Sequence, residues 1–246
     1  ARNCRSIVAP VLTTLKAVNV TLDGSGTLAI ANWLNWTSGI ATLSGGNYSF
    51  TSLQNASRTS FTVTGGAIGL PALTTLSYGT LSLAGGATAS APLLSNVDGA
   101  SLLVAGGVTL TLPSVTNYSG ADAATPTLRA SGAGSVLDLS NVVSLDFSVG
   151  HGHNLVIEAQ AGGKVDLRRA TQISDEASGV ARGALITADG AGSTIDLSTV
   201  VNFLDNSTYT GWDSSLTARN GGSISLGVQT SISTVTLSKD ADSSVF

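Results

Sequence analysis

The densest group of side chains able to do chemistry lies between residues 164 and 182. Glycan-cleaving enzymes use paired carboxylates as acid and base, or a basic side chain that takes a proton beside an acidic sugar. One interpretation is therefore a catalytic set; the competing one is a solvated charged edge without activity. The group comprises Lys164, Asp166, Arg168, Arg169, Asp175, Glu176 and Arg182, of which Asp166, Asp175, Glu176 and Arg182 are the catalytic candidates.

Three aspartates, Asp138, Asp166 and Asp196, recur at one position of a repeated phrase. If they stack on neighbouring strands, their carboxylates repel by roughly 1 kcal/mol per neighbouring pair in water. A structural Ca²⁺ held by carboxylate oxygens would relieve that repulsion. Lys164 and Arg168 would relieve it without a metal, so a calcium site is the alternative to a chain without any cofactor.

Aromatic and histidine side chains are expected in loops of the second half. Tyr118, Tyr209 and Trp212 could stack on sugar rings or pack the loops together. His151 and His153 form an H-x-H pair in a glycine-rich loop, but no third ligand has a fixed spacing, so we expect an exposed pair rather than a metal site. The candidate binding residues are Tyr118, His151, His153, Asp175, Glu176, Arg182, Tyr209 and Trp212. Trp33 and Trp36, in contrast, are expected to pack locally.

These residues belong to a sequence built from internal repeats. A glycine pair or its substitute marks each repeat, ending at Arg5, Gly26, Gly46, Gly66, Gly86, Gly107, Gly134, Gly163, Gly192 and Gly222. The intervals between these positions are 21, 20, 20, 20, 21, 27, 29, 29 and 30 residues. Such regularity indicates a solenoid.

Each repeat contains three short segments of alternating or L-x-x-L apolar pattern, as in Ile68/Leu70, Leu73/Leu76 and Leu81/Leu83. Period-two alternation predicts strands with one buried face. Three short strands can bury those faces only by stacking on the next repeat. We therefore predict an all-β, right-handed parallel β-helix with three strands per coil and about ten coils of 20–30 residues, roughly 50 Å long.

From residue 107 onward the repeats lengthen at one corner, between the second and third strands. We expect one solenoid domain over 1–246, with short coils in 1–106 and widened coils in 107–246. The added segments are 119–126, 148–153, 174–183 and 205–215. Because insertions at one position stack, they should form a continuous wall, which often marks a binding face.

The two ends of the sequence resemble interior coils. Residues 6–22 (SIVAPVLTTLKAVNVTL) align with 67–83 (AIGLPALTTLSYGTLSL), and no polar cap is visible. We therefore expect a segment excised from a longer protein, whose uncapped ends meet flanking repeats or other subunits.

Composition excludes several functions. The net charge is −4, with 11 Lys and Arg against 15 Asp and Glu, so a nucleic-acid partner is not expected. The uncharged stretch between Arg58 and Asp98 is broken by Gly and Pro, so no membrane span is expected. One cysteine, Cys4, excludes an internal disulfide.

The phrases GAGSVLDLSNVVSL, GAGSTIDLSTVVNF and GGAIGLPALTTL resemble the imperfect repeats of large secreted bacterial β-helix proteins, such as filamentous adhesins and autotransporter-like passengers. The resemblance covers residues 4 to about 238 and implies a secreted, cell-surface rod that is structural or adhesive. We therefore expect a non-enzymatic extracellular segment with a glycan- or protein-binding loop edge. A surface glycan is the candidate partner.

Two alternatives remain. The first is a carbohydrate-active β-helix enzyme, related to polysaccharide lyases or glycoside hydrolases. The second is a self-assembling or ice-binding solenoid. Self-assembly is suggested by the neutral first half and the uncapped coil ends, and ice binding by Thr80, Ser82, Thr109 and Thr111, although Gly69, Ala89 and the aspartates interrupt a regular threonine column.

Overall fold

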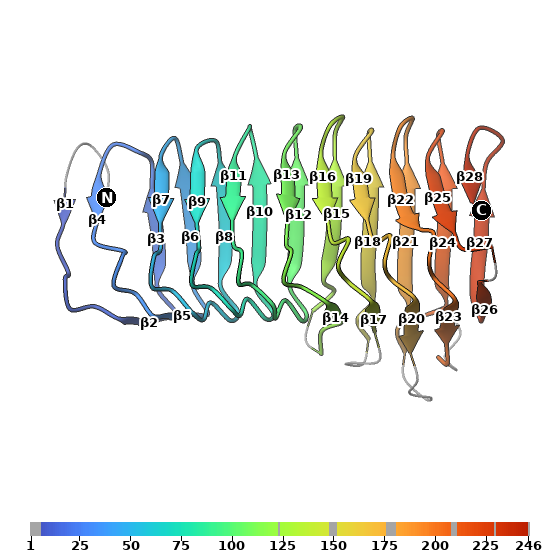
Figure 1. Cartoon of the computed structure of the whole chain (residues 1–246), viewed down its shortest axis with the longest axis horizontal. Coiled ribbons are helices and arrows are strands. Elements are labelled where there is room, and N and C mark those ends of the chain that lie inside the picture. The colour runs from blue at the N-terminus through green and yellow to red at the C-terminus, as the bar shows by residue number, and fades with distance from the viewer. Residues whose placement is uncertain are drawn as a thin grey trace.

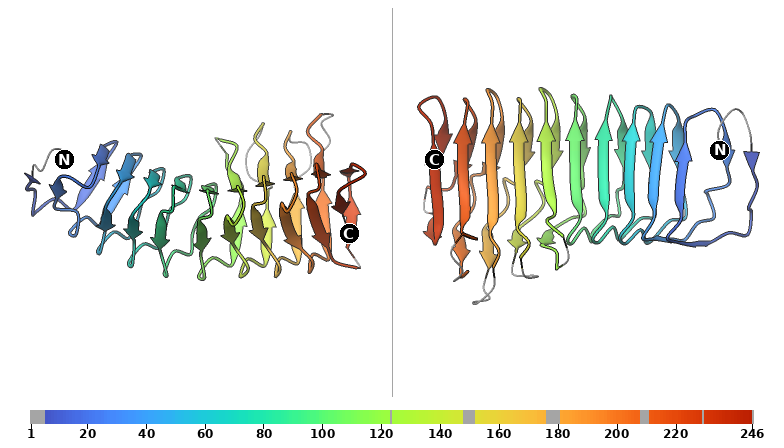
Figure 2. Two further views of the ribbon diagram at one scale, coloured as in Figure 1. Left: turned by 90° about the horizontal axis from the view of Figure 1, so that it is seen from above. Right: turned by 180° about the vertical axis from the view of Figure 1, so that it is seen from behind.

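The computed structural model describes residues 6–122, 124–147, 152–175, 181–207, 211–228 and 230–245. Within these ranges the chain forms 28 strands and no helix, and neighbouring coils pair in parallel. The strands wind around one axis, so the chain is a right-handed parallel β-helix, as the repeats predict (Figures 1 and 2). No part of these ranges forms a long apolar helix of the kind that crosses a membrane.

The third strand of each coil contributes to the longest sheet. Its ten strands stack in register, so each residue lies beside its equivalent in the next coil. In coil order they are β3 (Asn19–Leu22), β6 (Ile40–Ser44), β8 (Ser60–Thr64), β10 (Thr80–Ala84), β12 (Ser101–Ala105), β15 (Thr127–Ser131), β18 (Leu155–Gln160), β21 (Ala184–Asp189), β24 (Ser214–Arg219) and β27 (Val235–Lys239).

The first strands form a face that is interrupted twice. The three sheets are β1 (Ser6–Ile7) with β4 (Thr27–Leu28); β7 (Asn47–Ser49), β9 (Ala67–Gly69) and β11 (Thr88–Ser90); and β13 (Thr109–Thr111), β16 (Val136–Asp138), β19 (Lys164–Asp166), β22 (Thr194–Leu197), β25 (Ser223–Leu226) and β28 (Ser244–Val245).

The second strands form the remaining face. Single parallel bridges link Asn35, Asn55, Thr75 and Asn96 in the short coils. On either side lie a pair, β2 (Thr14–Lys16) with β5 (Asn35–Thr37), and a five-stranded sheet of β14 (Asn117–Ser119), β17 (Ser144–Asp146), β20 (Gln172–Asp175), β23 (Asn202–Asp205) and β26 (Ser231–Ser233).

The core is a stack of inward-facing apolar rows. In one row Leu43, Val63, Leu83 and Val104 are at most 1% exposed. Each such buried side chain contributes about 1.5–3 kcal/mol to the free energy of unfolding. Stacking between coils therefore supplies the burial that a single coil lacks.

Aromatic rings fill the core of the early coils. Trp33 packs edge-on against Trp36 with a centroid distance of 5.2 Å, and Trp36 packs against Phe61 at 5.6 Å. Phe50 contacts all three of these rings. The prediction of local packing for the two tryptophans is confirmed.

Two kinds of corner explain the repeat length. At the marker corner Gly66 has φ +69°, and a Cβ there would lie 2.0 Å from the Gly46 carbonyl oxygen, so only glycine fits. At the corner between the second and third strands, each short coil turns through one left-handed residue: Ala17, Ser38, Arg58, Tyr78 or Gly99. The coils of β14, β17, β20 and β23 replace that single residue with a loop. The expected widening of all coils in 107–246 is wrong for the last one, because β26 is joined to β27 by one left-handed residue, Thr234.

The threonine column suggested for ice binding is not formed by the four residues named above. Thr80 and Ser82 lie in β10 of the ten-stranded sheet, whereas Thr109 and Thr111 lie in β13 of the six-stranded sheet. The alternation of the sequence predicted that all four side chains point outward, but it did not predict that the two pairs lie in different sheets of the solenoid.

Candidate functional site

The widened edge of the solenoid is the strongest candidate site. We define it as the corner that follows β14, β17, β20 and β23, where the chain continues beyond the second strand before it enters the next third strand (Figure 1). These four strands lie in register, so their ends come out side by side.

A buried ion pair joins the two ends of the segment between β20 and β21. Arg182 donates from Nε to Asp175 Oδ2 at 2.7 Å and from Nη2 to Asp175 Oδ1 at 2.8 Å. Asp175 is fully buried and Arg182 is 2% exposed. The last residue of β20 is thereby joined through a bidentate, charge-assisted contact to the segment just before β21.

A second buried carboxylate closes the next coil in another way. Asp205 lies in register with Asp175 and is 1% exposed. Its Oδ1 accepts the Ser207 backbone N–H and its Oδ2 accepts the Ser214 backbone N–H, both at 2.8 Å. The Ser214 hydroxyl accepts the Ala184 backbone N–H, which ties this corner to the preceding coil.

The described members of the proposed catalytic group lie in two separate regions of the solenoid. Asp175 and Arg182 lie at the widened edge, whereas Asp166 lies in β19 on the face of the first strands. Glu176 lies outside the described residues. The expected solvated edge is also wrong for Asp175 and Arg182, because their charges are paired inside the protein.

Asp166 has its own basic partners, Lys164 Nζ at 3.2 Å and the Arg168 guanidinium, whose Nε lies at 2.8 Å. Burial raises the pKa of this carboxyl group, but hydrogen bonds from Arg168 and Lys164 outweigh that effect and hold its pKa at about 2. The side chain is therefore ionised at neutral pH and poorly suited to act as a general acid.

The predicted aspartate column is formed. Asp138, Asp166 and Asp196 stack in register on β16, β19 and β22. The pKa of the Arg168 guanidinium is raised chiefly by Asp166 and further by the charges of Asp196 and Asp138, so one cation lies within reach of all three. In the described part of the chain, no three metal-ligating side chains come together to hold an ion.

Asp138 and Asp166 also end their strands, and Asp196 is the last residue but one of β22. Each accepts the backbone N–H two residues further on, from Ser140 at 3.0 Å, Arg168 at 3.3 Å and Ser198 at 3.1 Å, respectively. Such a turn is a local reason for aspartate at this position. The sequences D-L-S and D-L-R are typical of such turns, so these aspartates could have been predicted as turn residues rather than as metal ligands.

Tyr118 is not in an inserted loop. It occupies the central position of β14, beside Leu145 of β17, with 1% exposure. Its hydroxyl donates to the Ala100 carbonyl oxygen at 2.7 Å, and burial, with the charge of Asp98, raises its pKa well above the usual range. The ring therefore belongs to the core and is not accessible to a sugar.

The remaining candidates divide between described and undescribed positions. Trp212 and His153 are partly exposed at the widened edge. The Trp212 backbone packs closely on the neighbouring coil, because a Cβ on Gly183 would lie 2.5 Å from the Trp212 carbonyl oxygen. His151 and Tyr209 lie outside the residues that the structure describes.

A groove of about 180 Å³ with a mixed polar and apolar lining lies beside the widened edge, on β20, β23 and β26. Its walls carry amide and hydroxyl groups from Gln172, Asn202, Ser231 and Ser233, with Phe203 and Leu204 completing the lining. Gln172, Asn202 and Ser231 are equivalent residues of successive coils. Sequence reasoning missed this groove, although the recurring polar residue that opens each second strand was a usable signal.

Comparison of the chain with protein-family models, with curated proteins and with solved structures gives no match.

Proposed function

We propose that this chain is a non-enzymatic length of extracellular β-helix whose widened edge binds a surface glycan. The observation that carries the proposal is the coincidence of three features at one edge: enlarged corners on successive coils, buried Asp175 and Asp205 at their bases, and beside them a groove whose lining residues carry no charge. Residues anchored in this way can present a partly exposed aromatic ring, Trp212, in a fixed place.

Binding is favoured over catalysis because the buried carboxylates that the structure describes are already engaged. Asp175 is paired with Arg182, Asp205 accepts two backbone N–H groups, and Asp166 is paired with Lys164 and Arg168. Glycoside cleavage needs two carboxyl groups that face one bond, one of them protonated. The groove offers amides and hydroxyls instead, which suit the hydroxyl groups of an uncharged sugar.

The proposal is tested on a glycan array with the intact chain and three variants. Trp212→Ala removes the exposed ring, and Asn202→Ala removes an amide from the groove. Thr62→Ala changes an exposed threonine on the ten-stranded sheet and is the control.

We expect wild-type binding to be retained by Thr62→Ala and to fall about tenfold in Trp212→Ala, the loss of one stacking contact of about 1–1.5 kcal/mol. No binding by the wild-type chain, or equal binding by all variants, would remove the widened edge as a site. Release of shortened glycans during the assay would favour the enzyme alternative.

A further inference from the structure

The structure contains a second unassigned opening, far along the solenoid from the widened edge. In the face of the first strands β4 pairs only with β1, and β7 pairs only with β9. No hydrogen bond joins β4 to β7, although they belong to successive coils. The two strands therefore present unpaired edges to each other.

The backbone groups on one of these edges can be identified. The Gly46 carbonyl oxygen accepts the Ala67 N–H, and the Phe50 N–H donates to the Gly69 carbonyl oxygen, so these two residues point toward β9. Successive residues of a strand direct their backbone groups to opposite sides. Asn47 and Ser49 consequently direct their N–H and C=O groups toward β4, where the fold supplies no partner.

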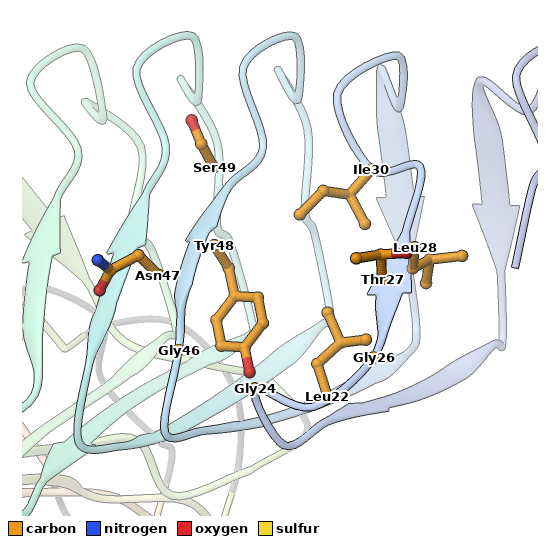
Figure 3. A pocket seen from close by; sticks show the side chains of 10 residues that line it. All are labelled: Leu22, Gly24, Gly26, Thr27, Leu28, Ile30, Gly46, Asn47, Tyr48 and Ser49. Carbon is orange, nitrogen blue, oxygen red and sulfur yellow. The ribbon is translucent and has the colours of Figure 1, made fainter. Parts of the chain in front are cut away.

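The opening between the edges is a slot of about 370 Å³ (Figure 3). It is closed at both ends. At one end Gly24 and Gly46 approach so closely that a Cβ on Gly46 would lie 3.3 Å from the Gly24 Cα. At the other end Thr51 Oγ1 donates to the Ala31 carbonyl oxygen at 3.1 Å. These two contacts limit the length of the slot, which favours a small molecule over an added polypeptide strand.

The slot is polar at its edges, apolar inside, and uncharged. Thr27, Asn47 and Ser49 contribute exposed side chains, whereas Leu22 and Ile30 are buried. The Tyr48 ring points into the slot and faces Leu22 (Figure 3), and its hydroxyl donates to the Ser44 carbonyl oxygen at 2.7 Å. None of the ten lining residues carries a charge.

We propose that this slot binds a single residue of a neutral sugar. Sugar hydroxyls donate and accept, which matches the alternating N–H and C=O groups of the unpaired edges. The C–H face of a pyranose matches the apolar interior and the Tyr48 ring. An anion finds no cation in the slot, and the backbone groups left unpaired by the gap are satisfied by the ligand or by water.

The test uses saturation-transfer NMR and calorimetry on the intact chain. The probes are glucose, galactose, mannose and N-acetylglucosamine, with glucuronate as a charged probe and acetyl-Gly-Ser-Gly-amide as a peptide probe. Leu28→Trp is designed to fill the slot, and Thr27→Ala and Asn47→Ala remove polar groups at its mouth. Thr194→Ala is the matched control, because Thr194 holds the same position in β22, which is paired on both sides.

We expect saturable binding of at least one neutral sugar, loss of that binding in Leu28→Trp, and three- to tenfold weaker binding in Thr27→Ala and Asn47→Ala, as for one neutral hydrogen bond. Thr194→Ala should bind as the wild type does, and circular dichroism should show that every variant is folded. The proposal is overturned if no neutral sugar binds, if only glucuronate or the peptide binds, or if folded Leu28→Trp binds normally. Trp212→Ala should leave this binding unchanged, so the result is independent of the widened edge.

Discussion

Removing the guanidinium at the widened edge should destabilise the widened coils strongly. In Arg182→Met the Asp175 carboxylate stays fully buried without its bidentate partner. Breaking a buried pair by removing one partner typically costs about 3–5 kcal/mol of unfolding free energy. The same change at Arg219, which is 57% exposed and pairs with Asp189, should cost at most about 1 kcal/mol.

The assay is hydrogen exchange combined with denaturant unfolding, because a long repeat array need not unfold in one step. In Arg182→Met, amides of β20, β21 and β23 should exchange faster, while those of β8 and β10 stay protected. The double variant Asp175→Leu/Arg182→Met should recover much of the loss, since an apolar pair avoids the desolvation of two charges.

The reasoning fails if Arg182→Met is no more destabilising than Arg219→Met. It also fails if the double variant loses as much as the two single variants together. Either result would mean that water or other groups replace the missing partner at little cost.

Three further predictions concern other parts of the chain. The Asp166 pKa is about 2 in the folded state and near its ordinary value of 3.8 in the unfolded state, so its stabilising effect is present above about pH 4 and is lost as the pH falls toward 2. Asp166→Asn should therefore show a shallower fall in melting temperature between pH 5 and pH 2 than the wild type. Trp36→Ala should lower the unfolding free energy by about 3–5 kcal/mol, measured by urea unfolding followed by circular dichroism, because the ring is fully buried against Phe50 and Phe61. Arg168→Gln should lower the melting temperature at low ionic strength, and added NaCl should reduce that loss, because the arginine supplies the charge that the three stacked aspartates need.

The repeat predicted the fold because the same few positions decide burial in every coil. The spacing of the glycines and the alternation of apolar residues gave the strands, their stacking and the all-parallel sheets. The corner of enlargement was also predictable, since strands such as β17 and β20 keep their register while the chain between the second and third strands lengthens.

The partners of individual side chains were less predictable. Tyr118 immediately precedes a long insertion, and sequence alone did not show that it fills the core position taken by Leu145, Ile173 and Phe203 in later coils. Asp175 and Arg182 are separated by a segment whose path no spacing rule fixes, so their pairing required the structure. The slot exists because β4 and β7 do not pair. The alternation of apolar residues is the same in these two strands as in paired ones, so the sequence did not predict the slot.

The buried charges distinguish the widened edge from a corner that merely tolerates extra residues. Lengthening a surface loop costs little, about 0.6 kcal/mol for each doubling of its length, so insertions need no dedicated anchor. A buried ion pair, in contrast, often stabilises no more than an apolar pair of similar size would. Asp175 with Arg182 therefore brings the coils little that an apolar pair could not, whereas Asp205 also satisfies two buried backbone N–H groups that leucine would leave unpaired. These contacts also determine the path of the chain, because a bidentate pair and a two-point backbone contact each fix the position at which a loop leaves the solenoid. On the proposed function, an edge that presents Trp212 and the neighbouring groove to a ligand needs that fixed geometry, whereas an inert spacer does not.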